Sequence, residues 1–563
     1  MREARPDAVE RRVLLRGIRD RDRSVCVVRA EPASAQARGS RACRAAVKRG
    51  KRGATAGIAY LVGAGPGDPG LLTVRGRELL DECDAIVHDA LANPALLIRS
   101  ESERPAPDLY DVGKRGGDDR SASQESINEL LVKLVREGRR VVRLKGGDPL
   151  VFGRGGEEAQ ALAEAALPFE IVPGVTSGIA APAYAGIPVT HRGLSTSVTF
   201  VTGHEDPDKL ATTTDWSALA RSGGTIVIYM GVRTLPRIAG ALVAGGLPGE
   251  IPAAAIEWGT HSRQRTAVAT LETLADVMTS QGIAPPVIVV IGWTVVLRDE
   301  IAWFDQRPLF GKRIIVTRAE EGLAKRGLGA RLRELGAEVL DAPTTRIERM
   351  DPAPMQEALE RLDDFQWICF TSANGVRFFW DALRATGRDA RALASVKLCT
   401  VGPMTADALL QRGLAVDVVA QRFVAEGLLE ALASRDDVYG MSVLYAAAEG
   451  ARETLPSGLE ALGAVVERVP LYRSVPEPAA LERLHEALAE RPADLVAFTS
   501  ASAVRSFAEA MGAQSSETPA ASIGPATSAA VREMGMAVAV EAAQSTLAGL
   551  VTAIADAYGA YDD

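Results

Sequence analysis

Cysteine, histidine and long apolar runs are scarce in this sequence, and each scarcity narrows what the chain can do. Only 5 of the 563 residues are cysteine and only 5 are histidine. The cysteines form no C-x-x-C pair and the histidines no H-E-x-x-H motif, which argues against a disulfide framework and a zinc site. We therefore expect a reducing, cytoplasmic environment and no bound metal.

The chain also lacks the run of about 18 apolar residues that a membrane span needs, and it shows no apolar core of a signal peptide. Its net charge is -8, so a broad basic surface for nucleic acid is not expected. Arginine is concentrated in residues 1–55, where short charged stretches occur without a sustained apolar period. We expect a basic, disordered extension there, with a basic arm for nucleic acid or membrane as the alternative.

What the chain does contain is a repeated alternation of strands and helices. A hydrophobic content of 47% and a charged content of 24% are typical of a globular protein, and the length predicts several domains. The first apolar strand runs into a Gly/Pro loop within Ile58–Gly70, and strand and helix patterns then alternate up to a junction at Ile301–Arg313. This alternation predicts α/β architecture with largely parallel sheets.

The C-terminal part contains an internal repeat. FTSANGVRFF (Phe370–Phe379) recurs as FTSASAVRSF (Phe498–Phe507), and VGPMTADAL (Val401–Leu409) recurs as IGPATSAAV (Ile523–Val531). Each copy is a strand, a Ser/Thr/Gly loop and a helix, and the copies follow in the same order. The repeat predicts two similar α/β lobes that face a cleft.

The loop GAGPGDPG invites a dinucleotide-binding interpretation, which its residues contradict. The fingerprint G-x-G-x-x-G starting at Gly63 needs a glycine at position 68, where Asp68 stands. Pro66 and Pro69 also remove backbone N–H groups that a pyrophosphate would need. Although Asp89 lies at a suitable distance for a ribose acid, the failed glycine pattern argues against NAD binding.

Residues from about Ile58 to Phe304 instead resemble the tetrapyrrole methylase family, and within it uroporphyrinogen-III C-methyltransferase. The motifs that carry the resemblance, in the family's order, are GAGPGDPGLLT, VGKRGG, RLKGGDPLVFGRGGEE, VPGVTSGIAAPAYAGIPVTHRG, VTGH, YMGV and EWGT. The resemblance implies S-adenosyl-L-methionine as cofactor, bound between two α/β lobes of a class III methyltransferase. It also implies a homodimer, and two methyl transfers that give precorrin-2 for siroheme and cobalamin.

Site residues follow from these motifs by resemblance. The cofactor-binding candidates are Pro66, Gly146, Gly147, Asp148, Val151, Thr176, Ser177, Met230 and Gly259. Arg154, Glu157 and Arg192 are candidates for holding the acidic substrate, because the planar guanidinium pairs carboxylates at two points. Asp89 and Lys114 are the candidate acid/base residues. His88 and Ala90 depart from the family pattern around Asp89, and a helix N-cap is its alternative role.

The chain from about Pro308 to Asp563 resembles uroporphyrinogen-III synthase, which cyclises hydroxymethylbilane with inversion of the last pyrrole and needs no metal or cofactor. The supporting motifs include GKRIIVTRA, both repeat copies, LYRS and QSTLAGLVTAI. The resemblance places a candidate acid at Tyr472. Ser372, Thr405, Ser500 and Thr527 are candidates for binding substrate carboxylates at loops that open helices. The alternatives are that the Ser and Thr residues are ordinary helix N-caps, and that Tyr472 is a strand residue packed at a lobe hinge.

We therefore predict a fusion of two consecutive enzymes of tetrapyrrole synthesis, each with two lobes and no nucleic-acid or membrane partner. The expected units are an extension at 1–55, a methyltransferase at 56–305 with lobes at about 56–190 and 191–305, and a synthase at 306–563 with lobes at about 306–344 plus 476–563 and at about 345–475. An active methyltransferase with a synthase-like domain that only binds tetrapyrrole is the main alternative. A second alternative is that the methyltransferase half methylates another precorrin.

Overall fold

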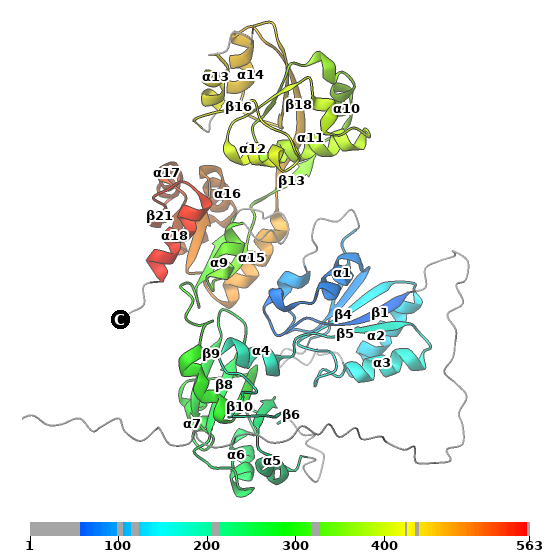
Figure 1. Ribbon diagram of the computed structural model, residues 1–563, viewed down its shortest axis with the longest axis vertical. Coiled ribbons are helices and arrows are strands. Elements are labelled where there is room, and N and C mark those ends of the chain that lie inside the picture. The colour runs from blue at the N-terminus through cyan, green and yellow to red at the C-terminus, as the bar shows by residue number, and fades with distance from the viewer. Residues whose placement is uncertain are drawn as a thin grey trace, which may run out of the picture. The chain divides into compact units, whose positions relative to one another are not determined.

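The computed structural model describes several stretches of the chain, namely residues 57–97, 105–113, 123–203, 214–317, 327–422, 425–433 and 439–559. Over these residues the strands form four separate sheets, each accompanied by helices (Figure 1). None of the helices in these stretches is long and apolar enough to cross a membrane. The α/β fold class expected from the sequence is confirmed. The basic extension expected at 1–55 lies outside the described residues.

The first sheet belongs to the N-terminal half and is entirely parallel. Its strand order is β3 (Asp108–Asp111), β2 (Ala85–His88), β4 (Arg140–Lys145), β1 (Ile58–Gly63) and β5 (Phe169–Val172). The interior strand β1 is an apolar run because helices cover both faces of the sheet. The carboxyl ends of all five strands lie at one edge, which is where the glycine-rich loops begin.

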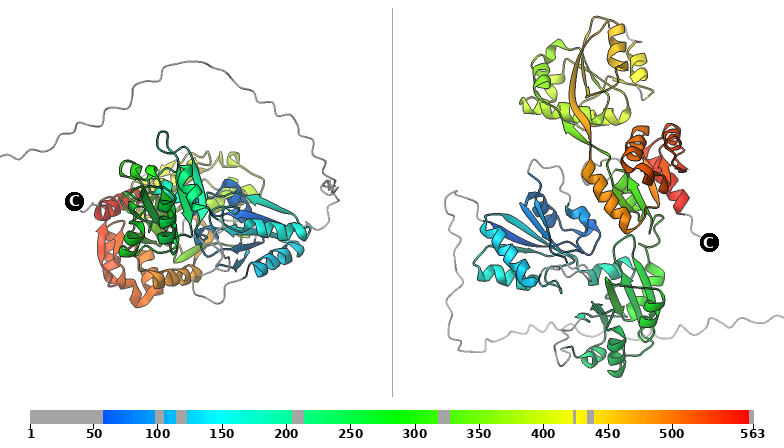
Figure 2. Two further views of the ribbon diagram at one scale, coloured as in Figure 1. Left: turned by 90° about the horizontal axis from the view of Figure 1, so that it is seen from below. Right: turned by 180° about the vertical axis from the view of Figure 1, so that it is seen from behind.

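Side chains of this sheet alternate between two cores. The covering helices are α1 (Val74–Glu82), α2 (Gln124–Arg136) and α3 (Gly155–Glu164). Val62 lies in one core with Leu80 of α1, whereas its neighbour Leu61 lies in the other core with Leu131 of α2. Figure 2 shows the blue and cyan helices on the two faces of this sheet. This follows from the two-residue period of a strand. Each fully buried aliphatic side chain contributes about 1.5–3 kcal/mol, so the two cores fix the edge that bears the loops.

The second sheet is mixed, so the expectation of largely parallel sheets is wrong here. Its order is β6 (Val198–Thr202), β7 (Thr225–Tyr229), β10 (Val287–Ile291), β8 (Pro252–Glu257) and β9 (Arg265–Thr270). Strands β6 and β7 are parallel, and the other pairs are antiparallel. Only residues 258–264 join β8 to β9, which is too short for the crossover of a dozen or more residues that a parallel pair requires.

Helices again cover both faces of the second sheet. They are α4 (Ser177–Tyr184), α5 (Trp216–Ser222), α6 (Leu235–Ala244) and α7 (Leu274–Ser280), followed after the sheet by the short α8 (Arg298–Ile301). Helix α4 packs on one face through Ala181 and Ala185, and α5 to α7 pack on the other. The N-terminus of α4 is thereby held beside Tyr229, at the carboxyl end of β7.

The third sheet is parallel and is assembled from two separate segments of the C-terminal half. Its order is β12 (Glu338–Asp341), β11 (Arg313–Val316), β19 (Leu495–Phe498), β20 (Ala520–Ser522) and β21 (Val538–Glu541). One face is covered by α9 (Leu328–Glu334) and α18 (Leu547–Tyr558), and the other by α15 (Pro478–Glu490), α16 (Ala501–Met511) and α17 (Pro525–Glu533). The chain thus leaves this sheet after β12 and returns to it at β19.

The fourth sheet is built from the residues in between. Its order is β13 (Thr345–Arg349), β18 (Val465–Pro476), β17 (Ser442–Ala448), β14 (Trp367–Phe370), β15 (Lys397–Thr400) and β16 (Val418–Val419). The helices are α10 (Ala353–Glu360), α11 (Ala373–Ala385) and α12 (Pro403–Leu410) on one face, and α13 (Ala425–Ala433) and α14 (Thr454–Ala461) on the other. Only β13 is antiparallel, and it pairs with β18.

The repeated motifs of the sequence occupy equivalent places in the third and fourth sheets. In one copy β14 leads into α11 and β15 into α12, and in the other β19 leads into α16 and β20 into α17. Each first loop ends in a serine that caps the helix, and each second loop ends in a Gly-Pro pair. Both copies therefore present helix N-termini at the carboxyl edge of their sheet.

Candidate active sites

In the N-terminal half, glycine-rich loops meet at the carboxyl edge of the first sheet. Gly65 follows β1 and Gly147 follows β4, and the N–H of each donates to the C=O of the other at 3.2 and 2.8 Å. A Cβ atom added to Gly63 would lie 2.5 Å from the Cα atom of Gly174, which is far inside contact distance. Only glycine permits this approach, so the loops after β1, β4 and β5 form one closely packed floor.

Asp148 joins two of these loops. Its Oδ2 accepts a hydrogen bond from the N–H of Gly174 at 3.0 Å, and its Oδ1 accepts one from the N–H of Leu150 at 2.8 Å. Both carboxylate oxygens therefore already have backbone partners. Beside it the surface at Gly146 is open, because a Cβ built there would meet, among the described residues, only the side chain of Leu91 at 3.6 Å.

The N-terminus of α4 lies against the same loops. A Cβ on Gly147 would lie 3.6 Å from the backbone nitrogen of Ser177. Thr176 Oγ1 lies 2.7 Å from the hydroxyl of Tyr229, and the N–H of Gly178 donates to that hydroxyl at 2.8 Å. Burial raises the pKa of Tyr229, which keeps the phenol neutral. The next residue, Met230, has a left-handed φ of 52° and a side chain that is 54% exposed.

Hydrogen bonds also tie the Pro66 loop to the second sheet. The N–H of Asp68 donates to Thr260 Oγ1 at 3.0 Å, and the hydroxyl of Tyr184 donates to Asp68 Oδ2 at 2.6 Å. A Cβ on Gly259 would lie 2.3 Å from that of Ala181, so this turn also depends on glycine. Val151, another cofactor-binding candidate, packs at the edge of the core between α4 and the second sheet. The loops that carry these candidates are thus linked by direct contacts.

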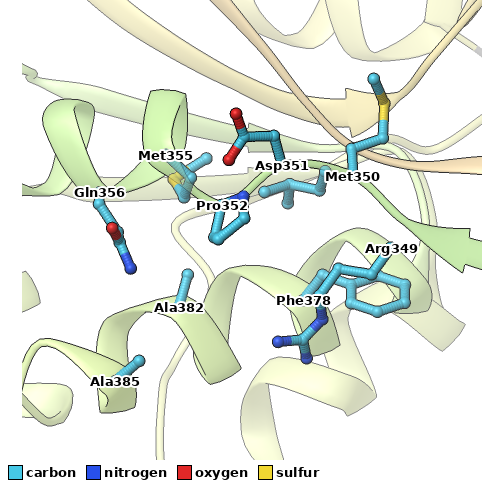
Figure 3. Close-up of a pocket in the computed structure, with 10 residues that line it drawn as sticks. Arg349, Met350, Asp351, Pro352, Met355, Gln356, Phe378, Ala382 and Ala385 are labelled. Carbon is cyan, nitrogen blue, oxygen red and sulfur yellow. The ribbon is translucent and has the colours of Figure 1, made fainter.

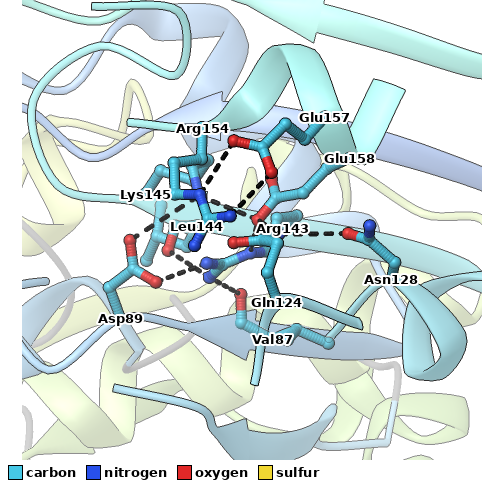
Figure 4. Close-up of polar contacts among 10 residues, drawn as sticks. All are labelled: Val87, Asp89, Gln124, Asn128, Arg143, Leu144, Lys145, Arg154, Glu157 and Glu158. Atoms are coloured by element: carbon cyan, nitrogen blue, oxygen red, sulfur yellow. Dashed lines mark hydrogen bonds and ion pairs between the residues drawn. The ribbon is translucent and has the colours of Figure 1, made fainter. Parts of the chain in front are cut away.

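Asp89 follows β2, and its carboxylate accepts a hydrogen bond from the guanidinium group of Arg143 (Figure 4). Its second oxygen, Oδ2, lies 3.9 Å from Nζ of Lys145. The alternative role of Asp89 as a helix N-cap does not hold, because the next helical turn begins only at Pro94 and Asn93 accepts from its first turn. The other acid/base candidate, Lys114, lies outside the described residues.

The substrate-binding candidates of this half are exposed. Arg154 and Glu157 form a two-point ion pair, with Nε–Oε1 and Nη2–Oε2 distances of 2.8 and 2.7 Å. The hydrogen bond from Arg154 holds the pKa of Glu157 below its ordinary value. Arg154 has a φ of 60°, the kind of sparsely populated conformation that clusters at functional sites. Arg192 lies in an exposed turn that backbone hydrogen bonds between His191 and Ser195 close.

In the C-terminal half, Tyr472 is the best-connected candidate. It lies on β18, is only 7% exposed, and its hydroxyl is 2.7 Å from Ser372 Oγ. Ser372 also accepts the N–H of Gly375 at 3.0 Å and so caps α11, as the N-cap interpretation expects. The ring of Tyr472 stacks on Phe378, with centroids 5.5 Å apart. The tyrosine hydroxyl is therefore coupled to a helix N-terminus through one serine.

The second copy of the repeat has a different partner at this place. Ser500 caps α16 by accepting the N–H of Ala503 at 3.2 Å, and its Oγ lies 3.0 Å from that of Ser502. Thr405 and Thr527 lie in the first turns of α12 and α17 and are buried. The repeat therefore gives two capped helices, of which only the first contacts a tyrosine hydroxyl among the described residues.

Comparison with known proteins agrees with this division into halves. The family model "Tetrapyrrole (Corrin/Porphyrin) Methylases" matches residues 59–275, and the model "Uroporphyrinogen-III synthase HemD" matches residues 327–552. The "Porphyrin biosynthesis protein HemD" of Ruminiclostridium josui is 38% identical over 466 residues, which are 81% of this chain and 89% of that protein. The chain belongs to both families.

Two further similarities concern the methylase half. The "S-adenosyl-L-methionine-dependent uroporphyrinogen III methyltransferase" of Methanosarcina barkeri is 50% identical over 243 residues, 43% of this chain and 94% of that protein. The crystal structure of uroporphyrin III C-methyl transferase from Thermus thermophilus is 35% identical, with a TM-score of 0.36, and covers 43% of this chain and 99% of that one. The family prediction made from the motifs is thus confirmed.

Sequence reasoning missed several residues of the methylase site. Arg143, Lys145 and Glu158 form buried ion pairs behind Asp89, and Tyr229 supports the start of α4. The signal was available in RVVRLK, because a strand with both faces covered is expected to be apolar and this one carries two interior cations. Charges in such a strand indicate a site rather than a core.

The synthase half contains a cavity that the sequence did not predict. Its volume is about 130 Å³, and its polar lining comes from Arg349, Asp351 and Gln356 (Figure 3). Phe378 forms part of its wall and supports Tyr472 with its ring, while the guanidinium carbon of Arg349 lies 5.3 Å from the centroid of that ring. The cavity thus lies close to the ring that supports Tyr472, and none of the candidate residues lines it.

Proposed function

We propose that the two halves catalyse consecutive steps. The synthase half cyclises hydroxymethylbilane to uroporphyrinogen III, and the methylase half transfers two methyl groups from S-adenosyl-L-methionine to that product, which gives precorrin-2. The observation that carries the proposal for the methylase half is the meeting of three glycine loops with the N-terminus of α4, next to Asp89 and its buried cations. The name of the Methanosarcina relative supports the choice of cofactor and substrate.

The methylase loops fit an adenosyl sulfonium compound. Gly146 presents an open backbone surface, and the neighbouring Thr176 and Ser177 offer hydroxyl and N–H groups. The exposed Met230 adds apolar contact area. The cofactor supplies an electrophilic methyl group. We propose that Pro66, Gly146, Gly147, Asp148, Val151, Thr176, Ser177, Met230 and Gly259 hold it, with Asp148 acting mainly by fixing the loop.

The chain's own residues then manage the substrate and its protons. We propose that Arg154, Glu157 and Arg192 bind the carboxylate-rich rim of the tetrapyrrole, because guanidinium groups pair carboxylates at two points. Asp89 Oδ2, which among the described residues has only the longer contact to Lys145, accepts the proton that the macrocycle loses from a meso carbon or a ring nitrogen after methylation, because the methylated pyrrole carbon itself carries no hydrogen. Lys114 is proposed as its acid/base partner. Holding the reactants in line is worth roughly 7–11 kcal/mol of the barrier.

In the synthase half, Tyr472 is proposed as the acid that assists loss of water from hydroxymethylbilane. Its contact with the α11 cap supports this role, since the positive end of a helix favours the charge that a phenolate develops. Ser372 and Ser500, with the helix openings at Thr405 and Thr527, are proposed to hold substrate carboxylates. The rest of catalysis is positioning, which folds the linear substrate so that the inverted ring closes.

We propose that the protein works in the cytoplasm, that it dimerises through the methylase half, and that the functional boundary between the enzymes falls at about residues 305–306. The segment between the end of α8 at Ile301 and the start of β11 at Arg313 contains no helix or strand, which supports that boundary.

One incubation tests the proposed function. Full-length protein receives enzymatically generated hydroxymethylbilane, with or without S-adenosyl-L-methionine, and the products are separated by chromatography. We expect the type III isomer without the cofactor and dimethylated product with it. If only the type I isomer forms without the cofactor, the synthase half does not catalyse and is a tetrapyrrole-binding module. If uroporphyrinogen III is supplied and stays unmethylated, the substrate proposed for the methylase half is wrong.

A further inference from the structure

Four charged side chains form a compact cluster behind the methylase loops, which we call the charged cluster: Asp89, Arg143, Lys145 and Glu158 (Figure 4). Glu158 is fully buried, and Arg143 and Lys145 are 2% and 3% exposed. The side chain of Asp89 is 32% exposed. Asp89 is therefore the one member that reaches the open side of the site.

The fold explains why these four meet. Arg143 and Lys145 are two residues apart on β4, so both side chains lie on one face of the sheet. Glu158 enters from the first turn of α3, which covers that face, and Asp89 follows the neighbouring strand β2. The cluster is thus fixed by three regular elements. None of its members depends on a loop for its place except Asp89.

Glu158 is the centre of the hydrogen bonding. Its Oε1 accepts from Nε of Arg143 and from Nζ of Lys145, both at 2.9 Å. Gln124 adds a longer contact of 3.5 Å to the same oxygen. The other oxygen, Oε2, is buried and has no hydrogen-bond partner within the part of the chain that the structure describes. One carboxylate oxygen therefore organises both buried cations.

Arg143 transmits this arrangement to Asp89. With Nε held by Glu158, its Nη1 donates to the carbonyls of Val87 and Leu144 at 3.2 and 3.4 Å. The remaining nitrogen, Nη2, is then directed at Asp89 Oδ1. A guanidinium group is a rigid fork, so fixing two of its nitrogens fixes the third. The orientation of the Asp89 carboxylate consequently depends on Glu158.

The energetics also argue for a functional role. Burying an ion costs several kcal/mol, and an ion pair in a core is often no more stable than apolar side chains of the same volume. The cluster holds two cations and two carboxylates, so it is balanced only while Glu158 is charged. Stability alone does not require such an arrangement, and its single open member is the proposed proton acceptor.

We propose that Glu158 is a positioning residue for methyl transfer, which acts through Arg143 and Lys145 to hold the Asp89 carboxylate in its reactive orientation. This inference rests on the proposed role of Asp89. It adds to that role a residue that contacts neither cofactor nor substrate. The Asp89 side chain would otherwise turn freely at the end of β2, with its two oxygens equivalent.

The test is a double-mutant cycle in the full-length protein. Glu158→Gln keeps the volume of the side chain and removes its charge, Asp89→Asn removes the proposed proton acceptor, and the double variant combines them. Glu164→Gln, an exposed residue on the same helix α3, is the matched control. The readout is the single-turnover rate of methyl transfer at saturating uroporphyrinogen III and S-adenosyl-L-methionine, with thermal melting as a check on folding.

We expect E158Q to slow the wild-type protein by about 10- to 100-fold, the loss that misplacing a reactive group by about 1 Å produces. In the D89N background the same change is expected to slow the rate by less than about twofold, because the group it positions is gone. E164Q is expected to match the wild type. Affinity for S-adenosylhomocysteine, measured by calorimetry, is expected to stay within about twofold in E158Q, since β4 holds the Gly146 loop through the sheet.

Three outcomes would overturn the inference. One is a folded E158Q protein that transfers methyl groups at the wild-type rate. Another is an equal slowing by E158Q in both backgrounds, which indicates a purely structural role. If E158Q does not fold, Lys145→Gln replaces it in the cycle and must show the same loss in the wild-type background only; equal losses in both again refute the proposal. A D89N protein as fast as the wild type would instead refute the proposed role of Asp89 itself.

Discussion

The two halves of the chain differ in how much charge they bury. Over the described residues, the methylase half buries Arg143, Lys145, Glu158 and Glu257, beside hydroxyls such as those of Thr225 and Thr294. The buried polar side chains of the synthase half, apart from Arg313, are hydroxyls, namely Thr317, Thr344, Thr400, Thr405, Ser515, Thr518, Ser522, Thr527 and Ser528 over the residues described there. Fixed charges suit a reaction in which the macrocycle gains charge with a methyl group and then loses a proton. Neutral hydroxyls and helix N-termini suit the folding of a long, flexible anion.

The two halves also differ in the backbone conformations of their non-glycine residues. Non-glycine residues with a positive φ occur only in the methylase half, as far as the described residues go, and most flank the candidate loops: Phe152, Arg154, Met230, Trp258 and Thr260. Each such conformation costs of order 1–3 kcal/mol and persists only where packing enforces it. The described positive φ angles of the synthase half all belong to glycine. The methylase site is thus preorganised, whereas the synthase site is unstrained.

The largest effect expected is that of Asp89→Asn. If fixed charge is what the methylase half contributes, this change lowers the rate of methyl transfer by about 10²–10⁴-fold, the usual share of a general acid or base. Transfer of labelled methyl groups to supplied uroporphyrinogen III measures it. Cyclisation by the same preparation is the internal control and is expected to be unchanged. A loss of less than about fivefold would show that the contrast of buried charge has no catalytic meaning.

Tyr472→Phe is the counterpart in the synthase half, with a smaller expected effect. The change removes one hydroxyl and leaves the stack on Phe378, so cyclisation to the type III isomer slows by about 10- to 100-fold and spontaneous type I isomer accumulates. Chromatography of both isomers measures the ratio. Methylation of supplied uroporphyrinogen III serves as the control. If Y472F loses as much as D89N, the synthase half depends on one group as strongly as the methylase half does.

Much of the fold could be predicted from the sequence. The main error concerns strand direction in the second sheet, and its cause lies in one short turn. Apolar strands between helical patterns identified the α/β class, and the order of the motifs identified both families. The mixed second sheet was not predicted, because strand direction depends on the length of the turn at 258–264 rather than on the composition of β8 and β9. The alternation of strands and helices indicates parallel strands only where a helix joins them, and no helix lies between β8 and β9.

The candidate sites were predicted unevenly. Gly147 and Thr176 could be found because the motifs that hold them resemble those of the tetrapyrrole methylases, and the structure brings them into contact. Their assignment to a cofactor stays a prediction. Glu158 could not be found this way, since it reads as one of several helix glutamates and its importance comes from the burial that α3 imposes. The coupling of Tyr472 to Ser372 also needed the structure, because Tyr472 lies on β18 and Ser372 caps α11, 100 residues earlier in the chain.

The two copies of the repeat give a finer version of the comparison. Ser372→Ala and Ser500→Ala each remove a helix N-cap, so each is expected to destabilise its lobe by about 1 kcal/mol. Only Ser372 contacts Tyr472, so only S372A is expected to slow cyclisation, by about threefold to tenfold. Thermal melting and the initial rate of cyclisation separate the two effects. Equal rate losses in both variants would mean that the serines act as anion binders alike, without help from the tyrosine.

The last effect expected concerns the pH dependence of stability rather than a reaction rate, and it again distinguishes the halves. His261 lies under the Pro66 loop, where a Cβ on Gly67 would meet its Nε2 at 2.1 Å. Burial, and then the charge of Arg263, lower the pKa of His261 to about 4. The unfolded chain, with an ordinary histidine pKa of about 6.5, binds the proton first as the pH falls. The stability due to the neutral ring is therefore complete above about pH 6.5 and is lost towards pH 4, at most about 3 kcal/mol.

His261→Gln isolates this contribution. The variant is expected to melt at a lower temperature than the wild type at pH 7.5, because a packed ring is lost. Its melting temperature is expected to fall less than that of the wild type on acidification to pH 5. Melting of the full chain at the two pH values, followed by methylase activity after brief heating, assigns the change to the methylase half. The exposed His485 of the synthase half is the matched control, and His485→Gln is expected to leave the acid sensitivity as it is. An unchanged difference between pH 7.5 and pH 5 in H261Q would mean that other groups, and not this buried ring, set the acid sensitivity of the loop that carries Pro66.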